Sequence, residues 1–427
     1  MKKFNILVFP CGSEIALDIH SSVKYSTYFH LIGGSSVSDH GMYVYEDYIP
    51  DIPYVTDSNF ISTLKTIIAE RKIDAVYPAM DIAITMLKEH EEELGCKVIS
   101  SPVETTQISL SKDLTYKKLA DTILIPKIYD PLEIPISAFP VFAKPKIGYS
   151  AKGTKKLNNQ REVNAFIAEN DDILILEYLP GEEYTVDCFT DRHRNLLFCG
   201  ARKRNRVSNG ISVNTFFSEN QEEFVKLARL INEKIHFRGA WFFQVKRNVN
   251  GQLCLLEIAS RLGGSSLLSR AKGVNFALLS LFDAFDHDVS VFTNDYDIIL
   301  DRALECKYKL NVSFESVYCD YDDCLVLNGY KLNTLLVQFL YQCVNENKKV
   351  YLLTKHTGTD LNEELKKFRI YSLFDKIIHI DNLANKADYI KEKDSIFIDD
   401  SHAERLNIKE RLNIPVFAPE MVDALLK

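Results

Sequence analysis

Short apolar runs alternate with helical stretches through the first hundred residues. The apolar runs occupy residues 6–9, 74–79 and 97–100, and the helical stretches occupy residues 14–22 and 60–71. This alternation is typical of parallel strands joined by helices. The pattern predicts a small parallel α/β domain over residues 1–100.

The apolar runs become longer and more closely spaced in the middle of the chain. They are VFAKPK at 141–146, ILILEYL at 173–179, YTVDCFT at 184–190, LLFCGARK at 196–203, AWFFQVKR at 240–247 and LCLLEIAS at 253–260. Strands this close together leave little room for crossover helices between all of them, which favours antiparallel pairing. We expect an α+β domain that contains an antiparallel sheet over residues 101–305.

The last block returns to buried strands separated by helices. The strands are SVYCD at 316–320, VYLLT at 350–354, KIIHID at 376–381 and SIFIDD at 395–400, and the intervening helices are expected at 332–345 and 363–374. This order predicts a second doubly wound parallel sheet over residues 306–427.

The amino-acid composition and net charge exclude two classes of protein. The chain has 427 residues, of which 46% are hydrophobic and 26% are charged, as in ordinary globular proteins. Its net charge of −8 repels polyanions. The sequence therefore excludes a nucleic-acid coat protein and a polybasic membrane binder.

The ends of the apolar runs and the cysteines indicate the compartment. The N-terminal apolar run stops at Pro10, which is too short for a signal peptide, and no run reaches the ~18 residues that a membrane-spanning helix needs. Nine cysteines without a C-x-x-C pair favour reduced thiols over a disulfide framework or a zinc site. We expect a cytoplasmic protein with no membrane partner.

One central strand carries a lysine and runs into a loop that two glycines bracket. Lys144 is on the strand, and Gly148 and Gly153 bracket a loop that contains Ser150. The backbone N–H groups of such a loop can lie over phosphates while the lysines offset their charge. A surface hairpin with solvated lysines fits the same residues, so this loop alone leaves both interpretations open.

Polar residues interrupt two later apolar strands. Gln244 is on one and Glu257 is on the next. A buried unpaired carboxylate is costly, so Glu257 requires a cation or an arginine nearby. Because Mg²⁺ prefers ligand oxygens from carboxylates and substrate phosphates, these two residues could form a metal-binding edge. A structural salt bridge from Glu257 to Arg261 is the alternative.

Several motifs in a fixed order together resemble the ATP-grasp superfamily. They are Ser111-Lys112-Asp113, then FAKPKIGYSAKG, EYLPGEEYTVD, GAWFFQVK and EIASRLGGSS. The resemblance covers roughly residues 1–300 and is closest to the carbamoyl-phosphate-synthase-like and amino-acid-ligase branches. It identifies residues 1–100 as a pre-ATP-grasp domain and residues 101–305 as the ATP-grasp domain.

The resemblance implies a role for each matching residue. ATP phosphates would lie against Lys112, Lys144, Gly148, Ser150 and Gly153, adenine against Glu177 and Leu179, and ribose against Glu183. Mg²⁺, or Mn²⁺ in its place, would be bound by Gln244 and Glu257, and Arg261 would touch the transferred phosphate. The family usually has a further asparagine ligand two positions after the metal-binding glutamate, where this chain has Ala259.

Such a site activates a substrate carboxylate as an acyl phosphate, which an amine then attacks. The substrates would be a small-molecule carboxylate and an amine, with Arg202 and Arg270 as candidates to clamp a carboxylate. An enzyme that releases a carbamoyl or acyl phosphate, and an ATP sensor without turnover, are the alternatives. Because related ligases often form dimers, a homodimer is an expectation of the resemblance.

In the C-terminal block, polar residues follow the strands at their carboxyl ends. Asp320 and Asp322 follow the first strand, Thr354 ends the second, and Asp399 and Asp400 end another, with Lys386 before it. The carboxyl ends of parallel strands meet at the crevice where α/β sheets bind ligands. Carboxylates, a hydroxyl and a lysine at one edge outline a Mg²⁺-phosphate site.

This arrangement resembles the haloacid dehalogenase (HAD) superfamily of phosphatases over about residues 312–427. The resemblance implies that Asp320 is the nucleophile, Asp322 the general acid and base, and Thr354 and Lys386 the groups that stabilise the phosphoryl group. Asp320, Asp322, Asp399 and Asp400 would hold Mg²⁺. Cys324 stands where the family commonly has Thr or Val, which removes no catalytic group.

The spacing of these C-terminal motifs leaves no room for a cap domain. Only 28 residues separate Leu325 from Thr354, and 31 separate Thr354 from Lys386. Specificity would then come from a large substrate, a partner or the ATP-grasp half. The sequence therefore predicts a bifunctional enzyme in which a capless phosphatase acts on a phosphorylated small molecule related to the ligase reaction. No histidine shows metal-ligand spacing, so we do not expect a catalytic histidine.

Overall fold

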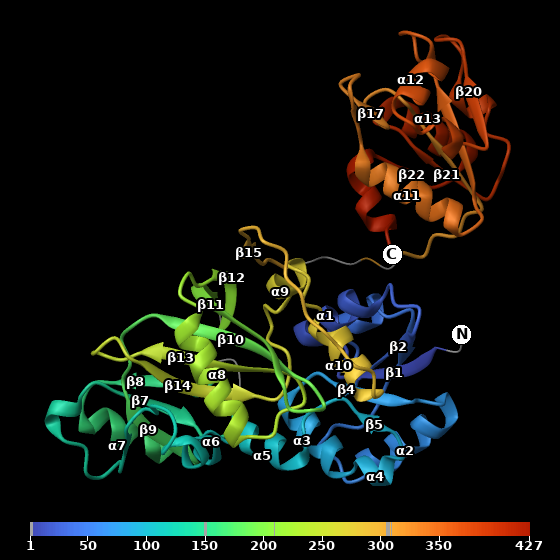
Figure 1. Cartoon of the computed structure of the whole chain (residues 1–427). Helices are drawn as coiled ribbons and strands as arrows, with labels where there is room; N and C mark the ends of the chain where they lie inside the picture. Colours follow the sequence, from blue (N-terminus) through green and yellow to red (C-terminus); the bar gives the residue numbers. More distant parts are fainter. Residues whose placement is uncertain (1–2, 149–151, 209, 305–307, 309) are drawn as a thin grey trace. The chain divides into compact units, whose positions relative to one another are not determined.

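The computed structural model describes residues 3–148, 152–208, 210–304, 308 and 310–427 (Figure 1). The chain divides into two compact units, Met1–Glu305 and Cys306–Lys427. Each unit is described by itself below. Ser150 and Cys306 lie outside the described residues.

The N-terminal part of the first unit is a five-stranded sheet of order β3-β2-β1-β4-β5. All its described pairs are parallel, as the sequence predicts. The strands are β1 (Phe4–Phe9), β2 (Phe29–Gly34), β3 (Asp47–Ile49), β4 (Ala75–Pro78) and β5 (Lys97–Val98), and the helices are α1 (Glu14–Val23), α2 (Phe60–Arg71), α3 (Asp81–Glu89) and α4 (Glu91–Leu94).

Alternate side chains of β1 supply two separate cores, as expected for a strand with helices on both faces. Ile6 and Val8 pack toward α1 and α10, whereas Leu7 and Phe9 pack toward α2 and α3. Figure 1 shows these helices on opposite faces of the sheet. The N-terminal domain is therefore a three-layer α/β structure.

Two antiparallel sheets follow. The four-stranded sheet has the order β6-β9-β7-β8 and the six-stranded sheet β14-β13-β10-β11-β12-β15. Their strands are β6 (Ile128–Tyr129), β7 (Val141–Pro145), β8 (Lys155–Leu157), β9 (Ile173–Glu177), β10 (Glu183–Thr190), β11 (Leu196–Ser208), β12 (Ile211–Phe217), β13 (Gly239–Arg247), β14 (Leu253–Ala259) and β15 (Ile299–Asp301). The predicted antiparallel region is confirmed, as two sheets rather than one.

Helices cover one side of each antiparallel sheet. Val163 of α7 packs into the core of the four-stranded sheet, and Phe224, Ala228 and Ile231 of α8 pack against the six-stranded sheet. The helices of this region are α5 (Val103–Leu110), α6 (Lys112–Leu119), α7 (Gln160–Glu169), α8 (Glu222–Lys234), α9 (Leu267–Ala271) and α10 (Phe276–Ala284).

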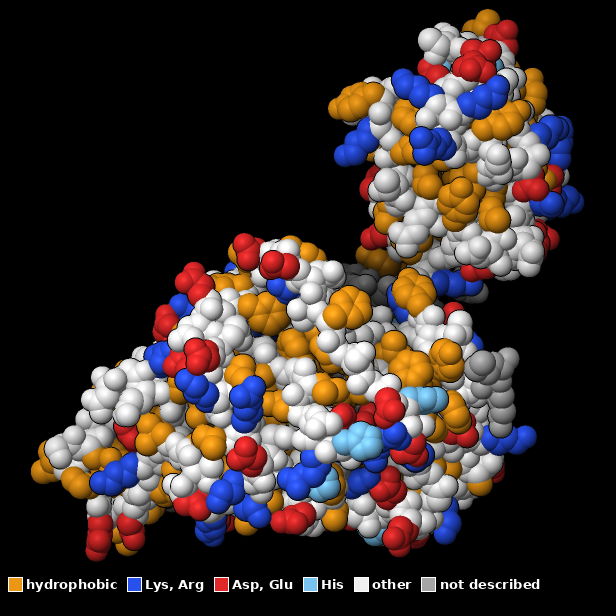
Figure 2. Space-filling view, viewed as in Figure 1, with side chains coloured by type: hydrophobic (Ala, Val, Ile, Leu, Met, Phe, Trp, Pro, Cys, Tyr) orange, Lys and Arg blue, Asp and Glu red, His pale blue; other side chains and the backbone are white. Residues whose placement is uncertain are grey.

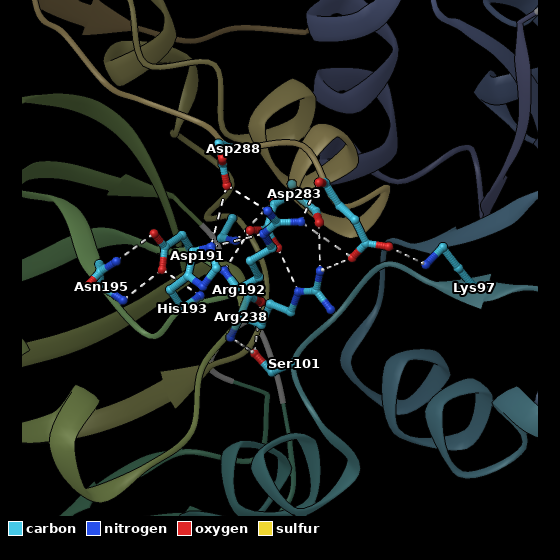
Figure 3. Close-up of polar contacts among 12 residues, drawn as sticks. Lys97, Ser101, Asp191, Arg192, His193, Asn195, Arg238, Asp283 and Asp288 are labelled. Atoms are coloured by element: carbon cyan, nitrogen blue, oxygen red, sulfur yellow. Dashed lines mark hydrogen bonds and ion pairs between the residues drawn. The ribbon is translucent and has the colours of Figure 1, made fainter.

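A network of polar contacts joins α10 to both neighbouring sheets (Figure 3). The buried carboxylate of Asp283 accepts a 2.7 Å bond from Arg238 Nε and another from the backbone N–H of Arg192. Arg238 also exchanges backbone hydrogen bonds with the Ser101 hydroxyl. Lys97 of β5 joins the same network, because its Nζ lies 3.6 Å from a carboxylate oxygen of Asp286, so the network links the N-terminal domain to the six-stranded sheet.

The second unit is a five-stranded parallel sheet of order β20-β19-β16-β21-β22, as the sequence predicts. A short hairpin follows its central strand. The strands are β16 (Ser316–Cys319), β19 (Lys349–Thr354), β20 (Lys376–His379), β21 (Ser395–Ile398) and β22 (Val416–Phe417), the hairpin is β17 (Val326–Leu327) with β18 (Lys331–Leu332), and the helices are α11 (Thr334–Asn345), α12 (Leu361–Lys367) and α13 (His402–Leu412).

One predicted helix is shorter than expected. The sequence predicts a helix over residues 363–374, but α12 ends at Lys367 and a separate turn spans Tyr371–Leu373. Arg369 adopts a left-handed backbone with φ of 60°, and the N–H of Ile370 bonds back to the carbonyl of Leu365. This left-handed termination closes the helix without a glycine.

Surface and cysteine features agree with the composition. Figure 2 shows positive and negative side chains intermixed on the visible face. In the described part of the chain, no helix is long and apolar enough to cross a membrane. The eight described cysteines are all free thiols, as predicted.

Candidate functional site

A cavity of about 320 Å³ lies between the two antiparallel sheets of the first unit. Residues from β7, β9, β10, β13 and β14 line it, together with the loop after β7 and the start of α6. Eight of the residues predicted to bind ATP or Mg²⁺ are among the lining residues: Lys112, Lys144, Gly148, Glu177, Leu179, Glu183, Gln244 and Glu257. Segments more than 140 positions apart in sequence thus converge on one cavity.

Two lysines supply positive charge at one side of the cavity. Lys112 is the first residue of α6, whose N-terminus Ser111 caps, and its Nζ donates to the carbonyl of Gly148 at 3.0 Å. Lys144 Nζ is buried and donates to the Tyr116 hydroxyl at 2.7 Å and to the carbonyl of Leu256 at 2.8 Å. The Lys112 amine therefore contacts the glycine loop and lies near β14, and the Lys144 amine contacts β14.

Burial changes the acidity of Lys144. Desolvation, together with the nearby charge of Lys112, lowers the pKa of its ammonium group to about 7, although Glu257 acts in the opposite direction. A lysine in this state gains a full charge most readily when an anion enters the cavity. This is the electrostatic behaviour expected of a phosphate-binding lysine.

The two residues predicted to bind the metal ion also lie side by side. Gln244 on β13 and Glu257 on β14 are directly opposite each other in the antiparallel register. Lys112 Nζ lies 4.0 Å from a Glu257 oxygen. An amide oxygen and a carboxylate are oxygen donors of the kind Mg²⁺ prefers, so these two residues fit such an ion together with substrate phosphates.

Ala259 stands where the ATP-grasp family usually has a further asparagine ligand, and its surroundings are apolar. Ala259 is buried and pairs with Phe242 across the sheet. The adjacent Ser260 lines a different cavity, of about 200 Å³, together with Arg261. Neither residue lines the cavity that holds Glu257. Among the described residues of that edge, Gln244 and Glu257 are the candidate oxygen donors for a metal ion.

The residues predicted to bind the nucleoside also line the cavity. Glu177 and Leu179 flank the end of β9, and Glu183 begins β10. Arg204 Nε lies 3.1 Å from one Glu183 oxygen, and Lys246 Nζ lies 3.5 Å from the other. Gly153, at the end of the glycine loop, has a φ of 70°, a left-handed backbone that glycine adopts without strain.

The three predicted arginines lie outside this cavity and each has a carboxylate partner. Arg261 binds both oxygens of Asp81 at 2.8 Å, so the structure does not contain the alternative bridge from Arg261 to Glu257. Arg202 binds Asp187 through two bonds in a fully buried pair. Arg270 Nη1 lies 2.7 Å from Asp18 of the N-terminal domain. A substrate carboxylate at any of them would have to share the guanidinium.

The second unit brings its predicted residues to one edge of the parallel sheet. Lys386 Nζ is buried and lies 2.7 Å from both Asp320 and Asp399. Carboxylate oxygens of Asp320, Asp399 and Asp400 all lie within 4.8 Å of one another. Three carboxylates at this spacing fit a hard cation such as Mg²⁺.

Electrostatics at this edge depend on burial and on close carboxylates. Burial and the charge of Asp320 raise the pKa of Asp399 to about 6, although Lys386 opposes the shift. Burial also raises the pKa of Asp320, whereas bonds from Lys386 and Thr354 lower it. Burial alone would depress the pKa of Lys386, but the two carboxylates outweigh it and the pKa is raised. The lysine therefore remains charged.

Sequence reasoning missed one residue of this edge. His356 Nδ1 lies 2.9 and 3.1 Å from the two oxygens of Asp322. We do not expect a catalytic histidine from the sequence, because no histidine has metal-ligand spacing. The available signal was position: His356 comes two residues after Thr354, directly past the end of β19.

Comparisons with known proteins find matches to parts of the chain. A family model described as "ATP-grasp in the biosynthetic pathway with Ter operon" matches residues 169–300. A D-alanine–D-alanine ligase of Fusobacterium nucleatum is 32% identical over 151 residues, which is 34% of this chain and 52% of the ligase. The chain thus spans about half the length of this curated relative.

Solved structures share the fold. Biotin carboxylase from Campylobacter jejuni superposes with a TM-score of 0.58 at 14% identity, covering 68% of this chain and 72% of the carboxylase. An L-amino acid ligase from Bacillus licheniformis gives 0.55 at 16% identity, covering 66% and 74%. The family model and the ligase relative match parts of this chain, and the solved structures share its fold, so the chain is similar to ATP-grasp proteins.

Proposed function

We propose that the first unit is an ATP- and Mg²⁺-dependent, ADP-forming ligase that joins a carboxylate to an amine. The observation that carries this proposal is the single cavity of about 320 Å³ onto which Lys112, Lys144, Gln244 and Glu257 converge. A cavity with two lysines at one end and a paired amide and carboxylate beside them suits a magnesium nucleotide.

The proposed chemistry follows from those charges. A substrate carboxylate oxygen attacks the γ-phosphorus of ATP, the bond to the β-phosphate oxygen breaks, and ADP leaves. Lys112 and Lys144 offset the negative charge on the phosphate oxygens, and the bound metal ion would neutralise more of it. The amine then attacks the acyl carbon and expels phosphate, with one proton of the amine lost to solvent.

The substrate class is proposed from the relatives. The matched curated relative is a D-alanine–D-alanine ligase, and one structural neighbour is an L-amino acid ligase. We propose that the carboxylate of this reaction belongs to an amino acid or a similar small acid. Release of an acyl or carbamoyl phosphate without an amine would instead indicate the alternative product, and ATP binding without ADP would indicate a sensor.

The test is release of ADP from ATP and Mg²⁺ across an array of carboxylates and amines, singly and in pairs. One pair should stimulate ADP release by wild-type protein, and Lys144→Met should abolish that stimulation. Lys146→Met is the matched control, because Lys146 directly follows the strand that carries Lys144, is partly exposed and pairs with Asp172. Equal stimulation in Lys144→Met would contradict the assigned cavity.

A second activity is favoured by a separate observation. The convergence of Asp320, Thr354, Lys386 and Asp399 at one sheet edge supports a HAD-type aspartate-nucleophile phosphatase in the second unit. In the proposed reaction Asp320 attacks the phosphorus of a phosphate ester, the ester P–O bond breaks, and Asp322 gives its proton to the leaving oxygen. Asp322 then takes a proton from water, whose oxygen displaces Asp320 from phosphorus.

Lys386 holds the Asp320 carboxylate in place for this attack and offers positive charge to the phosphoryl oxygens. Magnesium held by Asp320, Asp399 and Asp400 would neutralise the incoming phosphate when bound. The test is hydrolysis of p-nitrophenyl phosphate by the full chain in the presence of Mg²⁺. Asp320→Asn should lose this activity, and hydrolysis that survives the substitution would exclude Asp320 as the nucleophile.

A further inference from the structure

His356 is held at the edge of the proposed phosphatase site by contacts on every side. Its backbone N–H donates to the Thr354 hydroxyl at 3.2 Å, and its carbonyl accepts from His379 Nε2 at 2.7 Å. Its ring meets the Tyr321 ring edge-on, with centroids 5.0 Å apart. The side chain is only 8% exposed. The imidazole therefore has a fixed position rather than that of a mobile loop residue.

This fixed ring faces the carboxylate that must move a proton. Asp322 is half exposed, and His356 Nδ1 lies 2.9 and 3.1 Å from its two oxygens. When the carboxylate is ionised it only accepts hydrogen bonds, so Nδ1 is then the donor; when one carboxylate oxygen carries the proton, the other can still accept from Nδ1. An exposed aspartate otherwise samples several rotamers, whereas a donor that is itself fixed selects one of them.

Two further residues, Glu364 and Tyr321, lie close to the His356 ring. Its Nε2 is buried without a hydrogen-bond partner and lies 4.0 Å from the carboxylate of Glu364 on α12. Glu364 accepts a 2.5 Å bond from the hydroxyl of Tyr321, the residue between Asp320 and Asp322. Tyr321, His356 and Glu364 thus link the nucleophile loop, the end of β19 and α12.

We propose that His356 is a positioning residue that orients Asp322 toward the leaving oxygen of the phosphate ester. This inference rests on the proposed phosphatase function. His356 itself does not touch the reacting atoms; it keeps the Asp322 carboxylate where its proton can reach the ester oxygen as the P–O bond breaks.

The role predicts a dependence on the leaving group that a general loss of structure would not give. Departure of an alkoxide needs protonation by Asp322, whereas p-nitrophenolate leaves without much help. His356→Leu keeps most of the volume but removes the donor. It should lower kcat for glycerol phosphate by about tenfold or more, the range of a weakened general acid, and lower kcat for p-nitrophenyl phosphate much less.

Conservative variants distinguish the effect of the lost hydrogen bond from the effect of a changed side-chain volume. Asparagine can present an N–H near the position of Nδ1, so His356→Asn should recover most of the glycerol phosphate activity. Glutamine places its amide one bond farther out, so His356→Gln should remain impaired. Lys355→Gln is the matched control on the same loop, because Lys355 pairs with Glu404 of α13 and not with Asp322.

A double-mutant cycle in the full chain completes the test. If His356 acts through Asp322, His356→Leu should cause no further loss in an Asp322→Asn background. Equal losses for both esters, or an equal further loss in the Asp322→Asn background, would overturn the positioning role alone. Hydrolysis that does not depend on Asp320 for either ester would overturn the phosphatase proposal, and this inference with it.

Discussion

At the residue scale, Lys144 links burial to nucleotide binding. Desolvation lowers the pKa of Lys144 to about 7, so this side chain is mostly neutral at pH 8 and mostly charged at pH 6. The phosphates of ATP would favour the charged form, so binding should take up close to one proton at pH 8 and almost none at pH 6. Titration calorimetry in buffers of different ionisation heat measures this uptake.

The comparison that isolates Lys144 is between variants. Lys144→Met should lose the uptake at pH 8, while Lys146→Met should retain it, which removes the contribution of ATP's own phosphate groups. Proton uptake that is the same in wild type and Lys144→Met would show that ATP does not bind beside this lysine.

Arg202 and Asp187 form a pair whose loss we expect to be structural. Both side chains are 2% exposed and joined by two bonds. Arg202→Met leaves a buried carboxylate without its partner, which should lower the free energy of unfolding by about 3–5 kcal/mol. Urea denaturation checks this value. Asp187→Leu combined with Arg202→Met should be less destabilised than Arg202→Met alone, and a harmless Arg202→Met would refute the buried-pair argument.

Residues assigned from ordered motifs converge in space, because each motif fixes its own strand or loop. Lys112, Lys144 and Glu257 are of this kind. The partner of Arg261 could not be predicted in the same way, since Asp81 is 180 positions away in another domain. His356 was missed because a bond to Asp322 carries no spacing signal in the sequence.

At the scale of elements, the parallel or antiparallel pairing of the strands was predictable from the sequence where the apolar runs were uninterrupted. The parallel sheets at both ends and the antiparallel centre follow from run length and spacing. The end of α12 was not predictable, because Arg369 rather than a glycine takes the left-handed conformation that terminates it. Because no glycine marks the end of this helix, the helical periodicity of residues 363–374 continues unbroken in the sequence.

The start of α12 gives a testable consequence for the second unit. Asp360 caps this helix by accepting from the N–H groups of Asn362 and Glu363, and the helix carries Glu364. Asp360→Ala should lower the free energy of unfolding of this unit by about 1 kcal/mol, the usual cost of a lost cap. Asp360→Ser keeps an acceptor and should stay close to wild type in thermal or urea unfolding. Equal losses in both variants would assign the effect to something other than the cap.

At the scale of the whole molecule, the phosphatase-like unit poses a specificity problem. The insertion after β16 in the described residues is a short hairpin, β17 with β18, rather than a domain. A site without a cover binds a small ester weakly, because little of the ligand surface is buried. An enzyme of this kind gains selectivity from a substrate that is delivered or made by another active site. The ligase proposed for the same chain is one such source.

This reasoning leads to a prediction that requires both activities in one chain. Wild type and Asp320→Asn, supplied with ATP, Mg²⁺ and the stimulating pair of substrates, should release ADP at the same rate, because Asp320 is outside the ATP cavity. If the phosphatase acts on a phosphorylated precursor or product of the ligase, that compound should accumulate only with Asp320→Asn. Mass spectrometry and phosphorus NMR of the two mixtures would detect it. Identical products from both proteins would mean that the two sites act on unrelated substrates, even if each is active.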